Sequence, residues 1–413
     1  MAKKSINSIS YDDIIAAQGI VSEAGLTTPG HYSAEISALC GAGLYLKLEN
    51  LQPTGSFKVR GALIKLANLD GSDRSQGVVA MSAGNHAQGV AYHAQKLGIK
   101  ATIVMPTGTP FTKVNRTQRL GAKVILAGKT LTESQEQADR ISKSEGLVFI
   151  HPYDDPDIIT GQGTMALELL DDFPDIDTLV VPIGGGGLIS GISIAAKGRN
   201  PKIDIFGVEA SQYASMKSTL SGQEAQLGGS TVAEGIAVKA AGEITREIIA
   251  ENVRDILLAD EESLEQAMQI YLREQRLVVE GAGAAALAAI MTNRSIFEGR
   301  KIGVIVSGGN VDARLLSSVL LRGLVREGKL VRLRIEIADE PGELSQLTEI
   351  IGENGGNIVE VNHQRLFYNV PLKSTDVDVT METRDQDHVL VIQTALKKAG
   401  YPSLLLSDTM PNN

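Results

Sequence analysis

The feature that most constrains the fold is an alternation of short apolar segments with longer helical patterns between about Leu44 and Leu324. The clearest apolar segments are 77–81, 101–106, 122–126, 177–183, 203–208 and 301–306. Alternation of this kind predicts parallel β-sheets that are covered by helices. We therefore expect an α/β protein with two open parallel-sheet lobes and a ligand between them.

Length and charge narrow the class of protein. A chain of 413 residues predicts two or three domains, at roughly 150 residues each. The net charge of −10 argues against nucleic-acid and anionic-membrane partners. No apolar run approaches the roughly 20 residues of a membrane-spanning helix, and Met1–Ile6 lacks the apolar core of a signal peptide. Cys40 is the single cysteine, so we expect no internal disulfide, no cysteine metal cluster and a cytoplasmic location.

One lysine stands at an unusual place in the pattern. Lys58 follows a turn signal at 53–55 and a candidate helix-capping residue, Ser56. Apolar residues then recur at helical spacing, at Val59, Ala62, Leu63 and Leu66. Lys58 should therefore lie in the first helical turn, where the helix dipole lowers the pKa of an ammonium. Lysines are usually solvated surface cations, but an amine biased towards neutrality suits imine formation with an aldehyde cofactor.

A run of four glycines indicates a phosphate-binding turn. Residues 177–183 predict a buried strand, Gly184 to Gly187 follow at once, and 188–196 predict a helix. Bare backbone N–H groups at a helix start bind phosphate oxygens, although a tight turn alone is the simpler interpretation. Ile189 stands where a dinucleotide fingerprint has its third glycine, and no Walker lysine follows. A single phosphate monoester fits this loop better than a pyrophosphate.

The strand at 301–306 ends in a hydroxyl, Ser307, followed by Gly308 and Gly309. Ligands of open α/β sheets bind beyond the carboxyl ends of strands, so Ser307 is placed to contact one, although many such serines only form turns. An amine, a phosphate cradle and a strand-end hydroxyl together predict a pyridoxal 5′-phosphate site.

Four motifs in this order carry a family resemblance. They are Pro53-Thr54-Gly55-Ser56-Phe57-Lys58-Val59-Arg60, Ser82-Ala83-Gly84-Asn85-His86, Gly184 to Gly187, and Ser307-Gly308-Gly309-Asn310. Over essentially its whole length the chain resembles threonine dehydratase (threonine ammonia-lyase), a pyridoxal-phosphate enzyme of the tryptophan-synthase-β-like fold, in the form with one C-terminal ACT domain. The resemblance implies deamination of L-threonine to 2-oxobutanoate and ammonia, with L-serine as a secondary substrate.

The same resemblance implies a role for each motif. Lys58 corresponds to the Schiff-base lysine, and Phe57 packs beside the cofactor. Asn85 would bond the pyridoxal 3′-oxygen, and Ser307 would meet the pyridine nitrogen. The backbone amides of the glycine run would hold the phosphate: Gly184, Gly185, Gly186, Gly187 and Leu188. The loop that would bind the substrate carboxylate consists of Ser82, Ala83, Gly84, Asn85 and His86.

Some roles stay open at this point. His86 is either an acid–base group or an anchor of its loop, and Glu280 either faces the site or caps a helix. Serine racemases have a serine where this chain has Ala83, so elimination should dominate over racemisation. Glu209 matches one ligand of the racemases' divalent cation, but Ser215 replaces the other, so we expect no metal site. A β-replacement synthase and a serine racemase/dehydratase are the alternative enzymes; an inactive amino-acid sensor and a nicotinamide dehydrogenase fit less well.

The pattern changes near residue 326. We expect a catalytic domain at 1–325 with a smaller lobe at about 50–153, a linker at 326–330, and a regulatory domain at 331–413. We predict four strands, which begin at Val331 and lie at 358–366, 377–382 and 403–406. Helices are predicted near 344–351 and 387–399. This order resembles an ACT domain. The resemblance implies either that the domain binds an amino-acid effector such as isoleucine or valine, or that it serves only for dimerisation. We expect a homo-oligomer, either a dimer or a tetramer, and a metabolic role either in isoleucine biosynthesis or in catabolism.

Overall fold

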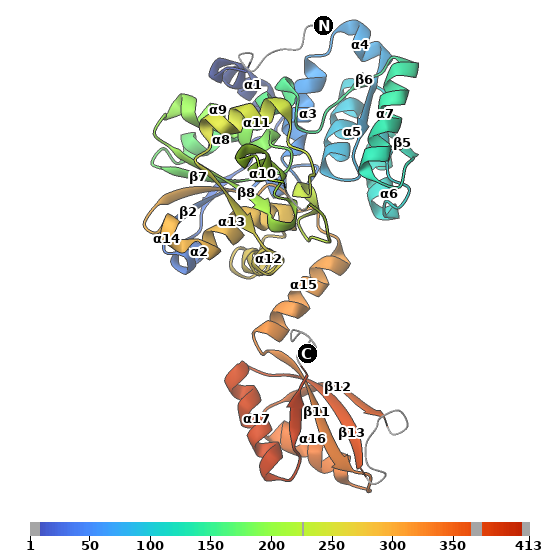
Figure 1. Cartoon of the computed structure of the whole chain (residues 1–413), viewed down its shortest axis with the longest axis vertical. Coiled ribbons are helices and arrows are strands. Elements are labelled where there is room, and N and C mark those ends of the chain that lie inside the picture. Colours follow the sequence, from blue (N-terminus) through green and yellow to red (C-terminus); the bar gives the residue numbers. More distant parts are fainter. Residues whose placement is uncertain (1–8, 225–226, 365–373, 407–413) are drawn as a thin grey trace. The chain divides into compact units, whose positions relative to one another are not determined.

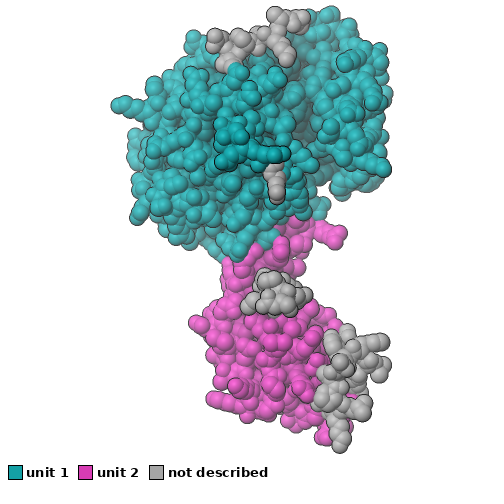
Figure 2. Space-filling model, in the orientation of Figure 1, with its two compact units in different colours: residues 1–312 teal, residues 313–413 magenta. Residues whose placement is uncertain are grey.

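The computed structural model describes residues 9–224, 227–364 and 374–406. The chain divides into two compact units, residues 1–312 and 313–413, which are coloured separately in Figure 2. The segment Met1–Ile6 and the last two residues of the strand predicted at 358–366 lie outside the described ranges, as do parts of the predicted domains 1–325 and 331–413.

The smaller sheet of the first unit is parallel throughout, with strand order β5-β4-β3-β6. Its strands are β3 Val78–Met81, β4 Ala101–Met105, β5 Lys123–Leu126 and β6 Val148–Phe149. Alternate residues face opposite sides, as the two-residue period of a strand requires. Ala80 and Ile103 pack into a core with helices α3 and α5, whereas Val79 and Val104 pack against helix α7. The helices of this lobe are α3 Lys58–Ala67, α4 Gly71–Gln76, α5 Asn85–Leu97, α6 Phe111–Arg119 and α7 Leu131–Glu145.

The larger sheet has the order β1-β2-β10-β7-β8-β9 and is parallel except for its edge strand β1. Its strands are β1 Gly30–Tyr32, β2 Gly43–Lys47, β7 Thr178–Pro182, β8 Asp204–Ala210, β9 Asp255–Ala259 and β10 Lys301–Ile305. Helices α8 (Pro156–Asp172) and α9 (Gly187–Arg199) share an apolar core with one face of this sheet, and α13 (Gly281–Thr292) packs against β7 to β10 (Figure 1). The prediction of helix-covered parallel sheets is confirmed, with the antiparallel edge as a departure.

The remaining helices of this unit surround the larger sheet. They are α1 Tyr11–Glu23, α2 Ala34–Cys40, α8 Pro156–Asp172, α9 Gly187–Arg199, α10 Ser215–Ser221, α11 Glu243–Asn252, α12 Glu261–Gln275, α13 Gly281–Thr292 and α14 Arg294–Phe297. Short 3-10 turns occupy Glu49–Leu51, Ser211–Tyr213 and Glu234–Ile236. Within the described ranges, no helix is both long and apolar enough to cross a membrane.

A buried ionic cluster joins helix α3 to helix α8. The guanidinium of Arg60 is fully buried and bonds Glu49, with Nη2 to Oε1 at 2.8 Å, and Glu168, with Nη1 to Oε1 at 2.5 Å. Lys47 Nζ reaches Glu168 Oε2 at 2.6 Å. Burial by itself raises the pKa of Glu49, but the Arg60 charge and hydrogen bonds lower it below its usual value. Two cations and two carboxylates thus compensate one another inside the fold.

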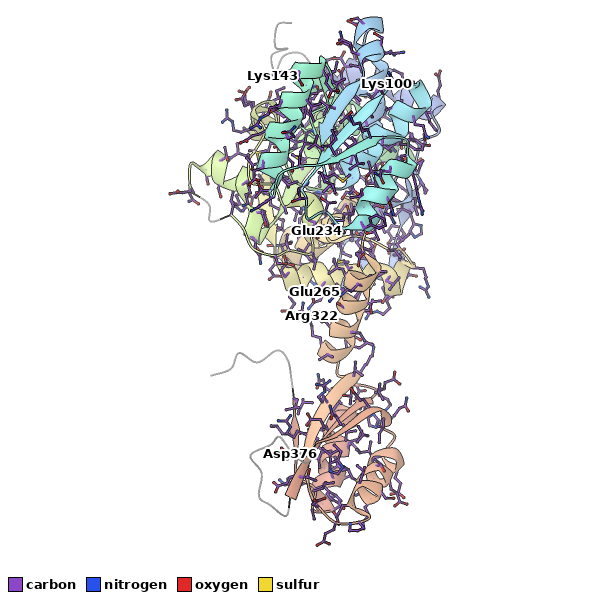
Figure 3. All side chains as sticks on the ribbon, turned by 90° about the vertical axis from the view of Figure 1, so that its right-hand side faces the viewer. Lys100, Lys143, Glu234, Glu265, Arg322 and Asp376 are labelled. Atoms are coloured by element: carbon purple, nitrogen blue, oxygen red, sulfur yellow. The ribbon has the colours of Figure 1, made fainter. Side chains whose placement is uncertain are left out.

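The second unit begins with helix α15, Ala313–Arg326, and continues with a four-stranded antiparallel sheet of order β12-β13-β11-β14. The elements are β11 Leu330–Ala338, α16 Glu343–Glu353, β12 Asn357–Gln364, β13 Ser374–Glu382, α17 Gln386–Lys398 and β14 Ser403–Leu405. Leu333, Ile351 and Ile392 belong to the core that this sheet shares with α16 and α17. The other face carries polar groups, including the Arg334–Asp378 pair at 2.7 Å and Asp376, which Figure 3 labels.

Candidate active site

Helix α3 places Lys58 at its first position, as the apolar spacing predicts. The prediction that Ser56 caps this helix is wrong, because Phe57 is the residue that precedes the first turn. Ser56 instead forms a β-bridge with Gly308, and its buried hydroxyl has no hydrogen-bond partner among the described residues. Lys58 Nζ donates a hydrogen bond to the carbonyl oxygen of Pro152 at 2.9 Å.

The pKa of the Lys58 amine is lowered to about 8. Burial is the main cause, because a low-dielectric environment disfavours the charged form. The negative charge of Glu280 acts in the opposite direction and raises this pKa. Burial therefore accounts for the predicted shift towards a neutral amine.

The glycine run connects β7 to α9. Gly186 has φ +99°, a backbone conformation that favours glycine. A Cβ atom at Gly185 would collide with the ring of Tyr153, and one at Gly186 would lie 2.7 Å from Thr245 Cβ. Leu188 is the second residue of α9 and is buried. The chain therefore enters a helix through a turn from which side chains are excluded, as a phosphate cradle requires.

The side chain of Asn85, at the start of α5, is held by two residues from the larger lobe. Its Nδ2 donates to Glu280 Oε1 at 2.7 Å, and its Oδ1 accepts from Asn310 Nδ2 at 2.8 Å. Burial raises the pKa of Glu280 to about 7, although the Asn85 hydrogen bond opposes the shift. Glu280 precedes α13 without a side-chain capping bond, so the structure favours its site-facing role over a capping role.

The loop after β3 contains the predicted carboxylate-binding residues. Gly84 N donates to Ser82 Oγ at 3.1 Å, which shapes the turn around Ala83. His86 Nε2 lies 3.0 Å from the carbonyl oxygen of Ile150. Burial, aided by the Lys58 charge, lowers the pKa of His86 to about 3, so its ring is neutral at physiological pH. This geometry favours loop anchoring over acid–base work.

Ser307 follows β10 and is buried beside the segment that leads into Lys58. Its carbonyl oxygen accepts from Phe57 N at 3.1 Å, and Gly309 N donates to Gly55 O at 2.9 Å. Lys58 Nζ lies 5.2 Å from the Phe57 ring centroid. The structure thus brings together the lysine, its aromatic neighbour and the strand-end serine.

Three contributors were not identified from the sequence. The Pro152 carbonyl has no sequence signal, because every residue carries one. Tyr153 has none either, since its contact with the glycine run depends on the fold. Asn310 lies in the same motif as Ser307, and its polarity next to two glycines was the available clue.

Glu209, which matched one cation ligand, is engaged by backbone groups. Its Oε1 accepts from Met216 N at 2.8 Å and its Oε2 from Lys217 N at 2.9 Å. Among the residues that the structure describes, no His, Cys, Asp and Glu side chains form a group suited to a metal ion.

Comparisons with known proteins show the family of this chain. The family model described as "Pyridoxal-phosphate dependent enzyme" matches residues 21–308. L-threonine ammonia-lyase of Thermotoga maritima is 42% identical over 395 residues, which cover 95% of this chain and 98% of that protein. Maize serine racemase superposes with a TM-score of 0.71 at 36% identity, covering 77% of this chain and 98% of that one. Processed threonine deaminase isoform 2 of Solanum lycopersicum superposes with a TM-score of 0.70 at 36% identity, covering 76% of this chain and 89% of that one.

Proposed function

Because this chain belongs to the family of pyridoxal-phosphate dependent enzymes, we propose that it converts L-threonine to 2-oxobutanoate and ammonia, with L-serine as a slower substrate. The observation that carries the proposal is the Lys58 amine, whose pKa is lowered to about 8. The preceding residue, Phe57, bonds Ser307 O through its N–H group, and Pro152, which accepts the Lys58 hydrogen bond, precedes the residue that packs on the glycine run. Near-whole-length similarity to an L-threonine ammonia-lyase supports the choice of substrate.

The residues present fit pyridoxal phosphate. The glycine run is a turn in which Cβ atoms would collide with neighbours, so none of its four residues has a side chain of its own to cover the amides. The buried Ser56 hydroxyl and His86 Nδ1 lack hydrogen-bond partners among the described residues, as expected beside a polar ligand. Lys58 would carry the aldehyde carbon, the amides of 184–188 would hold the phosphate, and Ser307 would meet the ring nitrogen.

When bound, pyridoxal phosphate supplies an electron-withdrawing ring that stabilises negative charge at the substrate Cα. Lys58 Nζ, with a pKa near neutrality, is suited to take the Cα proton and to hold it. The loop from Ser82 to His86 would orient the substrate carboxylate through its backbone amides. Elimination removes the Cα proton and the β-hydroxyl together as water. The enamine that remains tautomerises to an imine, whose C=N bond is hydrolysed to the oxo acid and ammonia.

The residue at position 83 favours elimination over racemisation. Racemisation needs an acid on the second face of Cα, and the alanine methyl of Ala83 has no proton to donate. The similarity to maize serine racemase makes a racemase the second candidate, and its distinguishing product is D-serine.

We also propose that residues 331–413 form an ACT domain that binds an amino-acid effector. Support comes from the strand–helix–strand–strand–helix–strand order and from the exposed turn 339–342 that precedes α16. A homo-oligomer in the cytoplasm is part of the same proposal.

The test is direct. Purified protein loaded with pyridoxal phosphate should release 2-oxobutanoate from L-threonine and, more slowly, pyruvate from L-serine. Keto acids are identified by mass spectrometry, and ammonia is assayed in the same samples. A loaded protein that forms no keto acid from either amino acid would contradict the proposal.

A further inference from the structure

The ring and the backbone of Tyr153 lie directly against the glycine run. A Cβ atom at Gly185 would meet three atoms of the Tyr153 ring, and one at Gly187 would lie 2.6 Å from the Tyr153 carbonyl oxygen. Gly184 and Gly186 face other neighbours, including Val238 and Thr245. Tyr153 therefore occupies the space that a side chain at Gly185 or Gly187 would need.

The backbone on both sides of Tyr153 is anchored. Tyr153 N and Asp154 N donate to His151 Nδ1 at 3.3 and 2.7 Å, and the His151 and Tyr153 rings meet edge-on at 4.7 Å. Asp154 accepts three hydrogen bonds of 3.0–3.1 Å from the first N–H groups of α11. Within α11, Thr245 Oγ1 donates to Gly185 O at 2.7 Å. Tyr153 and Thr245 thus both contact the glycine run. Asp154 links these two residues, because it follows Tyr153 in the chain and binds the start of the helix that contains Thr245.

The residue before Tyr153 fixes the catalytic amine, because Pro152 O accepts the Lys58 hydrogen bond. Consecutive residues therefore contact the two groups that would bind the aldehyde and the phosphate of one cofactor. The Tyr153 hydroxyl already donates to Ala240 O at 3.2 Å, and burial raises the pKa of this phenol above its usual value. The ring, rather than the hydroxyl, is the part that contacts Gly185.

We propose that Tyr153 is a positioning residue whose ring holds the glycine run in its phosphate-binding shape, and that Pro152-Tyr153 sets the spacing between the Lys58 amine and that cradle. The inference rests on the proposed cofactor site but not on the identity of the amino-acid substrate.

The test compares Tyr153→Phe with Tyr153→Ala in the full-length protein. Apoprotein is titrated with pyridoxal phosphate, and the dissociation constant is measured from visible absorbance. Tyr153→Phe should stay within about threefold of the parent, whereas Tyr153→Ala should bind about 10- to 100-fold more weakly, the range known for residues that orient metal ligands. At saturating cofactor the KM for threonine should change little. Tyr213→Ala is the matched control, because its hydroxyl also donates to a backbone carbonyl, Gly229 O.

A second pair of variants keeps the test independent of folding defects. Gly185→Ala should weaken cofactor binding in the parent, where the methyl meets the ring, but much less in the Tyr153→Ala background, so that the two effects are non-additive. Circular dichroism of each apoprotein checks that it is folded. The proposal is overturned if Tyr153→Ala binds the cofactor as tightly as the parent, or if Tyr153→Phe and Tyr153→Ala lose the same cofactor affinity. It is also overturned if the effects of Gly185→Ala and Tyr153→Ala on cofactor affinity are additive. If the protein binds the cofactor but does not deaminate threonine, only the proposed substrate is wrong, and the role of Tyr153 still stands.

Discussion

Lys58 shows how one side chain depends on several distant segments. Its helix supplies the position, Pro152 supplies a hydrogen-bond acceptor, and Glu280 supplies a charge that partly opposes the effect of burial. An amine in this setting can lose its proton near physiological pH, which an exposed lysine does only at about pH 10.4.

Replacing Lys58 should remove activity. Lys58→Ala lacks both the amine that holds the cofactor and the proposed Cα base, and Lys58→Arg keeps a guanidinium that stays protonated. We expect no more than a trace of 2-oxobutanoate from threonine with either variant. The release of keto acid is followed over time, and appreciable turnover by purified Lys58→Ala would reject the assignment.

The pH dependence of cofactor uptake should report the Lys58 pKa. Only the neutral amine attacks an aldehyde, so uptake of pyridoxal phosphate by the apoprotein should accelerate as pH rises and level off above about 8. Glu280→Gln removes a charge that raises this pKa, so its midpoint should move to lower pH. Absorbance after mixing measures the rate. The exposed carboxylate Glu136, changed to Gln, is the control, and an equal shift there would discredit the Glu280 effect.

We expect position 83 to decide between elimination and racemisation. L-serine should yield pyruvate with very little D-serine, since Ala83 provides no acid on the second face of Cα. Ala83→Ser should raise the proportion of D-serine. Chiral chromatography separates these products, and D-serine formed by the parent as fast as pyruvate is the result that would exclude this role of Ala83.

The sequence predicted the position of Lys58, the glycine turn and the end of β10, because each follows from local periodicity and turn chemistry. It could not predict the bonds from Asn85 to Glu280 and Asn310, which join residues far apart in the chain. The wrong assignment of Ser56 as a cap has the same origin: a tertiary bridge to Gly308 takes its backbone out of the capping position.

At the scale of elements, helix α3 is joined to α8 and to the 3-10 turn Glu49–Leu51 by ionic groups in the interior. Arg60 is two residues from Lys58, so the cluster also determines where the first turn of α3 lies. Such pairs contribute little net stability when intact but are costly to break, because the remaining charge stays buried.

Breaking this cluster should destabilise the first unit. Arg60→Ala should reduce the free energy of unfolding by about 3–5 kcal/mol, whereas Arg140→Ala on the exposed face of α7 should stay within about 0.5 kcal/mol. Urea unfolding followed by circular dichroism at pH 7 compares the two variants. Because the pKa of Glu49 is lowered in the folded state, its stabilising contribution should be present above pH 4.5 and fade as the pH falls through that lowered value. Equal stability of both variants would contradict this role.

At the scale of the whole molecule, the alternation of strands and helices was sufficient to predict parallel sheets in the first unit and the order of elements in the second. It did not predict the antiparallel edge strand β1, because three residues are too few to show a period. Every residue proposed for the active site precedes residue 312, and each unit has a separate apolar core.

Removing residues 331–413 should therefore preserve deamination and abolish any effector response. In the full-length enzyme we expect an amino acid such as isoleucine or valine to change the apparent threonine affinity by about 5- to 150-fold, the usual range of allosteric coupling. Threonine saturation curves with and without each amino acid, measured on both forms, make the comparison. If no amino acid alters the full-length curve, the regulatory role is wrong and assembly remains as the function of this unit.

The ionic cluster around Arg60 also has an electrical consequence for its neighbour. Its formal charges, from Lys47, Arg60, Glu49 and Glu168, sum to zero, and none of these four groups is among the causes of the Lys58 pKa shift. Glu280 is the charge that acts on the pKa of Lys58, and it partly offsets the effect of burial. An enzyme built in this way can be retuned to a different working pH by changing one carboxylate, while the charges that hold α3 in place are left alone.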